Sequence, residues 1–444
     1  MGTTCPESPP LLQDLRVTIH ETSMVFPSKE TEKRSLFLSN IDKVLNFEVE
    51  TVHFFGANKD FPPQKVAKMF KNALEDALVV YDFLGGRLNL NPETKRLEID
   101  CNAKGAGFVV ASSEYKLSEI GHLVYPNPSF AQFVHKSKDF LQQNDQPLCV
   151  AQLTSFKCGG FAIGFTTSHT TFDGLSFKTF LDNLAALAAN KPLAVIPCHD
   201  RHLLAARSPP RVSFPHHELI KLDNLPTGST ESSVFEASKE ELDFKVFQLT
   251  SHNILSLKEK AKGSTNARAT GFNVITAHIW RCKALSAPYN PSRSSTILYA
   301  VDIRPRLNPP LPKSFAGNAV LTAYATAKCE ELEKGEFSSL VGMVTEGAKR
   351  MSDEYTRSMI DWGEVHSGFP HGEVLVSSWW RLGFEEVEYP WGKPKYCCPV
   401  VYHRKDIILV FPPFGSGDDG INIIVALPPK EMDKFETLFY MFLN

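Results

Sequence analysis

The sequence predicts an α/β protein built from two domains of similar size. Its 444 residues are more than a single domain usually holds. Both halves contain stretches with the alternation of β-strands and stretches with the period of amphipathic helices. A long segment rich in Pro, His, Ser and Arg separates the halves. We therefore expect one domain over residues 1–190, a crossover linker over residues 191–238 and a second domain over residues 239–444.

The elements of the first half follow from the spacing of their apolar residues. Residues 47–50 alternate apolar and charged side chains and residues 51–55 end in an apolar run, which is typical of a strand. The segment from Pro63 to Tyr81 repeats apolar residues at helical spacing. The same patterns predict four further strands and a second helix, in that order, over residues 97–100, 108–110, 147–154, 160–168 and 175–188.

The second half begins where apolar periodicity returns after the linker. Strands are predicted over residues 244–249, 297–302 and 317–327. Helices are predicted over residues 254–262, 270–285 and 340–351. Near the end, strands over residues 407–411 and 421–427 form a predicted hairpin with its turn at residues 415–420, and a last helix starts near Pro429.

The composition indicates which partners to exclude and in which cellular compartment the protein is expected. The 47 Lys and Arg are balanced by 50 Asp and Glu, and the basic residues form no cluster. Because nucleic-acid binding relies on clustered basic side chains, we expect no nucleic acid as a partner. No uncharged apolar run reaches the roughly 20 residues of a membrane span. The nine cysteines have no regular spacing, so we expect reduced thiols in a cytoplasmic protein.

The strongest signal for chemistry is the segment H-T-T-F-D-G at residues 169–174, which follows an apolar strand and precedes a helix. Functional residues gather at such strand ends because the backbone there is rigid and the side chain can face a cleft. His169 is a candidate general base, although spacing alone leaves a core or surface histidine as an equal alternative. Asp173 is interpreted first as a helix N-cap or ion-pair partner and only second as a participant in the chemistry.

Other polar segments carry weaker signals. If residues 376–381 form a strand, Ser377 and Trp379 share one face and offer a hydroxyl and an indole N–H as donors. The alternative is that the tryptophans are core residues. The run from His216 to Glu218 has the wrong spacing for zinc and is interpreted as loop surface. The sequence contains neither G-x-S-x-G nor H-E-x-x-H, so it supports neither a serine-hydrolase nor a zinc-protease site.

Together these segments resemble the plant BAHD acyltransferases, which transfer acyl groups from coenzyme A thioesters to alcohols or amines. The segment H-T-T-F-D-G matches the family's H-x-x-x-D-G motif, and L-S-N-I-D at residues 38–42 matches an N-terminal signature. Residues 81–88 resemble Y-P-L-A-G-R-L with Asp in the proline's place, and residues 302–307 with Gly317-Asn318 match D-x-R-x-R…G-N. These signatures occur in family order, and the chain looks most like the GLAUCE-like branch, related to feruloyl transferases of ω-hydroxy fatty acids.

One family motif is altered in this chain. The family's D-F-G-W-G reads E-Y-P-W-G at residues 388–392. The resemblance implies that this segment is structural and lies away from the reaction centre. Pro390 cannot adopt the positive φ that glycine allows, so the local turn must differ. We expect the change to affect loop geometry and CoA affinity more than the chemistry.

The resemblance implies two pseudo-symmetric chloramphenicol-acetyltransferase-like domains with the active-site channel between them. It makes His169 the base that takes the acceptor proton, and it makes Ser377 and Trp379 contacts of the tetrahedral intermediate. The other implied site residues have structural roles: Asp173, which would pair with Arg304 and hold the His169 loop, and Gly174, Trp391 and Gly392.

The expected reaction is transfer of a hydroxycinnamoyl or acetyl group from acyl-CoA to a fatty or phenylpropanoid alcohol, by a monomeric enzyme. No metal or redox cofactor is implied, because the thioester already activates the acyl group and the protein need only position it. The CoA-binding residues are not identified. One alternative is a non-catalytic relative that binds a partner enzyme, which the intact His169 and Asp173 disfavour. Another is a polyamine N-acyltransferase, which acidic residues in the acceptor channel would indicate.

Overall fold

The computed structural model describes residues 12–123, 127–139, 145–222, 240–262, 269–400, 406–413 and 420–443. The chain divides into two compact units. Unit 1 comprises residues 1–203, 314–318 and 382–401, and unit 2 comprises residues 204–313, 319–381 and 402–444. Each unit contains helices and a six-stranded sheet, which confirms the predicted α/β class.

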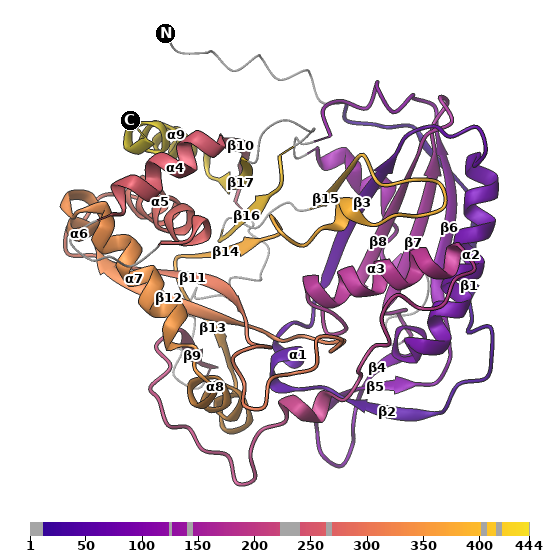
Figure 1. Cartoon of the computed structure of the whole chain (residues 1–444), viewed down its shortest axis with the longest axis horizontal. Coiled ribbons are helices and arrows are strands. Elements are labelled where there is room, and N and C mark those ends of the chain that lie inside the picture. The colour runs from indigo at the N-terminus through magenta and orange to yellow at the C-terminus, as the bar shows by residue number, and fades with distance from the viewer. Residues whose placement is uncertain are drawn as a thin grey trace. The chain divides into compact units, whose positions relative to one another are not determined.

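The sheet of unit 1 is mixed. Only β6 and β7 run parallel within it, and the other neighbours are antiparallel. Figure 1 shows the orange strand β15 beside the indigo strand β3, although more than 300 residues separate them in the chain. Across the sheet the order is β1 (Val17–Val25), β6 (Ala106–Ser113), β7 (Cys149–Ser155), β8 (Phe161–Ser168), β3 (Glu48–Phe55) and β15 (Tyr396–Pro399).

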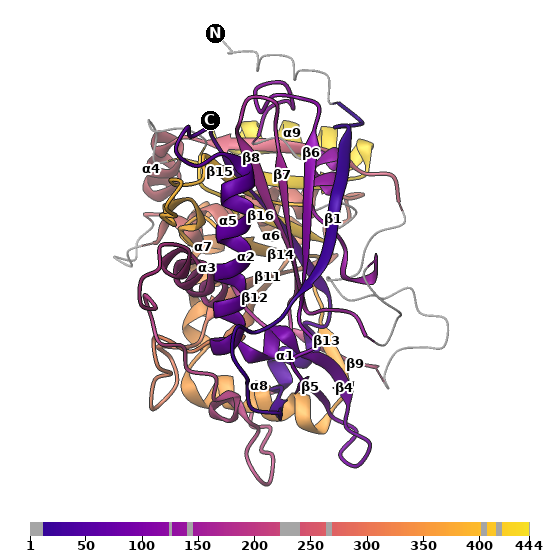
Figure 2. The same cartoon turned by 90° about the vertical axis from the view of Figure 1, so that its right-hand side faces the viewer.

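Two long helices of unit 1 pack against each other, α2 (Pro63–Val80) and α3 (Gly174–Ala188). Helix α2 runs along the strands of the unit, as Figure 2 shows. Its buried face contains Val66, Phe70 and Leu74, three of the residues that predicted this helix. The smaller elements of unit 1 are α1 (Asn40–Val44) and a three-stranded sheet in the order β2 (Arg34–Phe37), β5 (Leu97–Cys101), β4 (Arg87–Leu90).

The sheet of unit 2 contains a parallel centre, because β14 runs parallel to both β11 and β16. The predicted hairpin of β16 and β17 is confirmed as an antiparallel pair, and residues 415–419 of its predicted turn lie outside the described residues. The order is β10 (Asp243–Leu249), β17 (Ile421–Leu427), β16 (Ile407–Phe411), β14 (Val374–Ser378), β11 (Ser294–Asp302) and β12 (Val320–Lys328).

Helices and a short two-stranded sheet complete unit 2. Helix α5 packs against α4, α6, α7 and α9. The short sheet pairs β9 (Leu219–Lys221) with β13 (Gly368–Pro370). The helices described in unit 2 are α4 (Ser251–Lys260), α5 (Gly271–Ser286), α6 (Cys329–Lys334), α7 (Phe337–Arg350), α8 (Asp353–Val365) and α9 (Pro429–Leu443).

The chain passes between the units more often than a single linker requires. Residues 191–203 of the predicted linker belong to unit 1, as do residues 314–318 and 382–401 of the predicted second domain. The strand predicted over residues 317–327 begins only at Val320. The three residues before it are not strand, and two of them lie in the segment that returns to unit 1.

The interpretation of residues 216–218 as loop surface is wrong for two of the three. The side chains of His216 and Glu218 are both 0% exposed. The imidazole of His216 contacts Glu218 Oε1 through Nδ1 (3.1 Å) and Ser358 Oγ through Nε2 (2.8 Å). The Tyr355 hydroxyl donates to the same carboxylate oxygen at 2.7 Å. The polar sequence indicated a loop surface, but Glu218 Oε1 is shared by His216 and Tyr355 inside unit 2.

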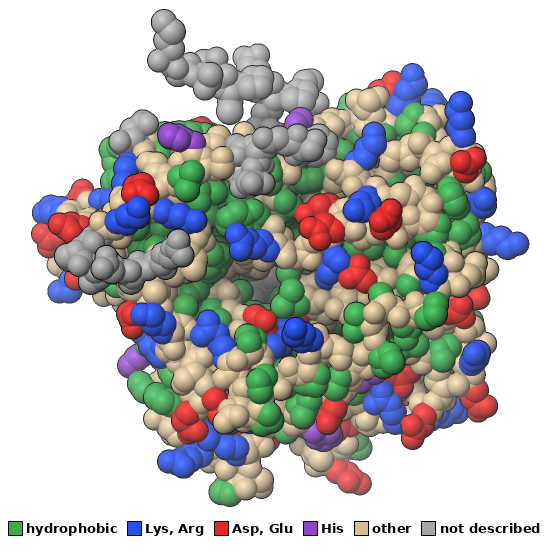
Figure 3. All heavy atoms as spheres, in the orientation of Figure 1, with side chains coloured by type: hydrophobic (Ala, Val, Ile, Leu, Met, Phe, Trp, Pro, Cys, Tyr) green, Lys and Arg blue, Asp and Glu red, His purple; other side chains and the backbone are tan. Residues whose placement is uncertain are grey.

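The surface agrees with the balanced composition. Figure 3 shows basic and acidic side chains interspersed over the face that it draws. None of the helices among the described residues is both long enough and apolar enough to span a membrane. The cysteines of the described residues are free thiols.

A buried histidine in unit 2 makes stability depend on pH. His278 on α5 is fully buried against the ring of Phe439, and burial lowers its pKa to about 3. In the unfolded chain a histidine has a pKa of about 6.5, so below that pH the unfolded state binds more protons than the folded state. Stability should fall with decreasing pH by up to about 1.4 kcal/mol per pH unit from this group.

We expect His278→Leu to flatten the pH dependence of the urea midpoint of unit 2 between about pH 6.5 and about pH 5. The exposed His252 provides the matched control, because His252→Leu should leave that dependence as in the unaltered protein. An unchanged dependence in His278→Leu would show that His278 is protonated in the folded state as readily as in the unfolded state.

Candidate active site

The segment at residues 169–174 forms the predicted turn between β8 and α3. The N–H of His169 donates to the carbonyl of Phe47 (2.8 Å), which ties the turn to the start of β3. The next two residues, Thr170 and Thr171, are fully buried. The Phe172 ring lies among other aromatic rings, 5.4 Å between centroids from Phe180. The turn is therefore rigid, and it fixes the backbone from which the His169 side chain projects.

Asp173 and Gly174 begin helix α3. The Asp173 carboxylate accepts a hydrogen bond from the N–H of Ser176 at 2.9 Å, so the interpretation of Asp173 as a helix N-cap is confirmed. A Cβ at position 174 would lie 2.5 Å from Leu382 Cδ1. Glycine therefore allows α3 to start close to the returning segment of residues 382–401.

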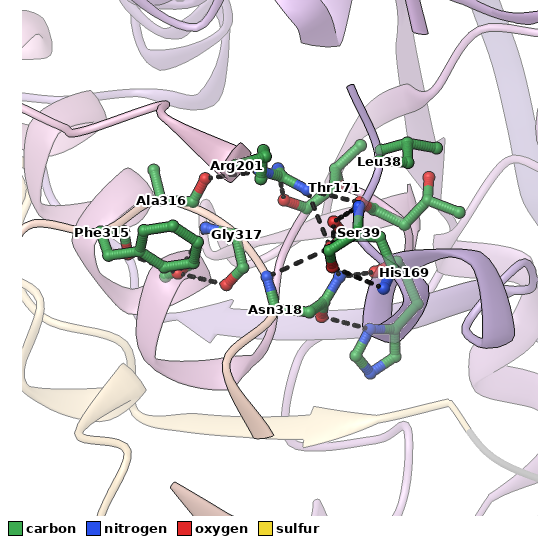
Figure 4. Close-up of polar contacts among 12 residues, drawn as sticks. Leu38, Ser39, His169, Thr171, Arg201, Phe315, Ala316, Gly317 and Asn318 are labelled. Carbon is green, nitrogen blue, oxygen red and sulfur yellow. Dashed lines mark hydrogen bonds and ion pairs between the residues drawn. The ribbon is translucent and has the colours of Figure 1, made fainter. Parts of the chain in front are cut away.

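The His169 imidazole is held by the side-chain amide of Asn318, which lies in the returning segment of residues 314–318. Its Nδ1 lies 3.1 Å from Asn318 Oδ1, and Asn318 Nδ2 donates to the backbone carbonyl of His169 at 2.7 Å. Figure 4 shows Asn318 reaching the His169 ring from the segment that contains Phe315, Ala316 and Gly317. One side chain thus grips both the ring and the backbone of His169.

A buried carboxylate stands behind this amide. Asp42 is fully buried at the third position of α1, where its Oδ2 accepts hydrogen bonds from the N–H and hydroxyl of Ser39, both at 2.8 Å. Its other oxygen, Oδ1, accepts from Asn318 Nδ2 at 2.8 Å and lies 2.9 Å from Nη1 of Arg201. The contacts of Oδ2 with Ser39 are part of a capping box, and those of Oδ1 with Asn318 and Arg201 join Asp42 to the site.

Arg201 is the buried counter-ion of Asp42, with a side chain that is 0% exposed. Besides Asp42, it donates to backbone carbonyls of the turn, Thr170 (3.1 Å) and Thr171 (2.7 Å). It also donates to the carbonyl of Ala316 at 3.2 Å. A Cβ at Gly317 would lie 2.6 Å from Arg201 Nε, so this glycine allows the backbone to approach the guanidinium.

The surroundings of His169 favour its neutral form. The ring is partly exposed, yet protein atoms pack densely around it, and the resulting desolvation lowers its pKa from the usual value. The carboxylates of Asp173 and Asp42 and the contact with Asn318 oppose this shift without cancelling it. A histidine that is neutral at about pH 7 can accept a proton, as a general base must.

The hydrogen bonds also indicate which ring nitrogen carries the lone pair. Asn318 Nδ2 faces two acceptors, the Asp42 carboxylate and the His169 carbonyl, so the amide is oriented with Oδ1 toward the imidazole. A carbonyl oxygen can only accept, and Nδ1 of His169 is therefore the protonated nitrogen. Nε2 then carries the lone pair.

The residues predicted from the resemblance fall in both units. Ser377 is the fourth residue of β14, and Trp379 follows that strand directly. The backbone N–H of Trp379 donates to the carbonyl of Val410 (2.7 Å). Both side chains are half-buried, so Trp379 is not a fully buried core residue. Arg304 contacts Asp302 at 3.0 Å in unit 2. The role of Ser377 and Trp379 at the reaction centre and the pairing of Asp173 with Arg304 stay predictions.

The altered motif lies in unit 1. Trp391 is buried, and its ring stacks on Tyr389 with 4.9 Å between centroids. The positive φ of this turn falls at Gly392 (φ 111°), whose N–H donates to the Tyr389 carbonyl at 2.9 Å. Pro390 thus occupies a position where no positive φ is needed, and glycine two residues later supplies it.

Three residues of the site had no role in the sequence analysis. Asp42 and Asn318 lie in segments recognised only as family signatures, and Arg201 lies in the predicted linker. The pattern S-x-x-D at residues 39–42 was a usable signal for a capping box and hence for α1. Nothing in the local sequence distinguishes Arg201 from a solvated linker arginine.

Comparisons with known proteins agree with this architecture. The sequence model of the Transferase family matches residues 15–442. The chain is 59% identical over 449 residues to acyltransferase GLAUCE of Arabidopsis thaliana, covering 99% of each chain. It is 32% identical to omega-hydroxypalmitate O-feruloyl transferase of the same plant, covering 96% of this chain and 93% of that one. The crystal structure of vinorine synthase superimposes with a TM-score of 0.74 at 24% identity, over 94% and 96% of the two chains.

Proposed function

Because the chain belongs to the Transferase family of acyl-CoA-dependent acyltransferases, we propose that it transfers a hydroxycinnamoyl or acetyl group from coenzyme A to the hydroxyl of a hydrophobic alcohol. His169 is the general base in this proposal. The observation that carries it is the contact of Nδ1 with Asn318, which leaves Nε2 as the basic nitrogen of a neutral ring.

The proposed reaction needs a base and a means of stabilising an oxyanion. Nε2 of His169 takes the proton of the acceptor hydroxyl while its oxygen attacks the thioester carbonyl, forming a tetrahedral oxyanion. The carbon–sulfur bond then breaks, and the CoA thiolate leaves and receives the proton from the imidazolium. Ser377 and Trp379 are the proposed donors to the oxyanion, and one such donor contributes on the order of 3–4 kcal/mol to the transition state.

The substrate class is proposed from chemistry that the relatives share. The name of the feruloyl transferase joins a hydroxycinnamoyl donor to the hydroxyl of a long-chain acid. A hydroxycinnamoyl-CoA and a fatty or phenylpropanoid alcohol are therefore the first pair to test, with acetyl-CoA as the second donor. No metal or further cofactor enters the proposed chemistry, because attack on a thioester requires only positioning and proton transfer.

Release of free CoA thiol by the purified protein tests the proposal. Feruloyl-, caffeoyl- and acetyl-CoA should each be combined with a fatty alcohol, a phenylpropanoid alcohol and a polyamine. We expect thiol release that requires an alcohol acceptor, with the ester identified by mass spectrometry. Release that requires the polyamine instead would replace the O-acyltransferase by an N-acyltransferase. Release with no acceptor would indicate a thioesterase.

A further inference from the structure

We propose that Asp42, held by Arg201, is a positioning residue of the acyl transfer: through Asn318 it keeps the proton of His169 on Nδ1 and the lone pair on Nε2. This inference deepens the proposed function and rests on His169 being its base. It assigns a role in the chemistry to a carboxylate 127 positions before His169 (169 − 42), outside the H-x-x-x-D-G motif.

The first step of the argument is the orientation of the Asn318 amide. Its NH₂ group has two acceptors, Asp42 Oδ1 at 2.8 Å and the His169 carbonyl at 2.7 Å. Turning the amide over would place its oxygen against both of these oxygens and leave these two acceptors without their donor. Asp42 therefore opposes the reversed amide, in which NH₂ would face His169 Nδ1 and select the other tautomer.

The second step is that Asp42 itself cannot turn away. Both carboxylate oxygens are engaged, Oδ2 by Ser39 and Oδ1 by Asn318 and Arg201. Arg201 in turn is fixed by carbonyls of the His169 turn and of Ala316. All of these residues belong to unit 1, so the arrangement is built within one compact unit.

The third step concerns charge. Asp42 from α1 and Asp173 from the turn both favour the protonated imidazole and raise its pKa, against the larger effect of desolvation. The guanidinium of Arg201 neutralises part of the Asp42 charge at 2.9 Å. Removing the Asp42 charge should thus lower the pKa of His169 further, which moves the acidic limb of the rate profile to lower pH.

The Asp42→Asn variant of the full chain tests the assignment. We expect kcat to fall about tenfold to a hundredfold with little change in KM, because the amide and ring lose their fixed orientation. The acidic limb of kcat/KM should shift to lower pH. In long-range ¹H–¹⁵N spectra, His169 Nδ1 should be the protonated nitrogen in the unaltered protein and share the proton with Nε2 in the variant.

Asp82→Asn is the matched control. Asp82 is also a buried aspartate of unit 1 that pairs with an arginine, Arg34, through contacts of 2.8 and 3.0 Å. Loss of that charge should lower stability without changing kcat, the pH limb or the His169 spectrum. If Asp82→Asn changes them as Asp42→Asn does, the effect is general destabilisation and the proposal fails.

A double-mutant cycle separates positioning from packing. If Asp42 acts through Asn318, then Asp42→Asn should have little further effect on kcat in an Asn318→Ala background. Additive losses would overturn the proposal. The nitrogen spectrum needs no turnover, so it decides the tautomer even if no acyl-CoA and acceptor pair reacts. In that case the proposed function fails while the positioning of His169 can still be confirmed or rejected.

Discussion

Replacing His169 by alanine should lower acceptor-dependent CoA release by about a hundredfold to ten-thousandfold, the usual contribution of a general base. The structure gives the reason. The ring is packed so that its pKa lies below the usual value, and Asn318 occupies Nδ1. Without the imidazole the acceptor hydroxyl must attack with its proton in place or lose it to water. The measurement is thiol release at saturating acyl-CoA, in the substrate panel described above.

The pH dependence provides a second readout of the same prediction. The unaltered protein should be active when His169 is neutral, so kcat/KM should fall only below the ordinary histidine pKa of about 6.5. That limb should vanish in His169→Ala. The exposed His20 of β1, which contacts Ser112, is the control, and His20→Ala should retain the full rate and the limb. Equal thiol release by His169→Ala and the unaltered protein would exclude His169 as the base.

Most of the fold was predictable because the elements near the cores have strong local patterns. Helix α2 has proline at its first turn and a clear apolar face, and β8 is a buried run that ends at a polar turn. Several elements without a prediction lack such patterns, although α8 (Asp353–Val365) has a Ser352 N-cap and a buried face that the sequence analysis did not use. Strand β1 is largely exposed, and α1 has only five residues. Strand β15 is a four-residue segment whose place is set by its pairing with β3, which no local pattern encodes.

The candidate site was predictable in part for the same reason. His169 stands where a strand meets a helix, and that signal is local. The contribution of Asn318 depends on a segment of five residues returning to unit 1, whereas the sequence pattern predicted a strand that already includes Asn318. Arg201 lies among prolines and polar residues, so its burial follows from contacts with segments that are distant in the chain. Such roles are set by tertiary contacts rather than by spacing.

The second large effect should come from Arg201→Met, which we expect to lower the free energy of unfolding by about 3–5 kcal/mol. The variant leaves the fully buried Asp42 without its counter-ion and removes the donors to the carbonyls of Thr170, Thr171 and Ala316. Urea unfolding followed by a probe in unit 1 measures the loss. Arg34→Met is the control, since the Arg34 side chain is 30% exposed and its loss leaves a less buried partner.

Two further variants separate charge from geometry at this position. Arg201→Lys keeps the positive charge, but one ammonium cannot reach three carbonyls and a carboxylate. Its free energy of unfolding should therefore lie between those of Arg201→Met and the unaltered protein. Combining Arg201→Met with Asp42→Asn removes the unpaired buried charge and should recover part of the loss, while the carbonyls remain unsatisfied. If Arg201→Met unfolds at the same urea concentration as the unaltered protein, the ion pair does not hold the returning segment in place. The His169 turn would then owe its rigidity to the packing of Thr170, Thr171 and Phe172 and to the hydrogen bonds of His169 with Phe47 and Asn318.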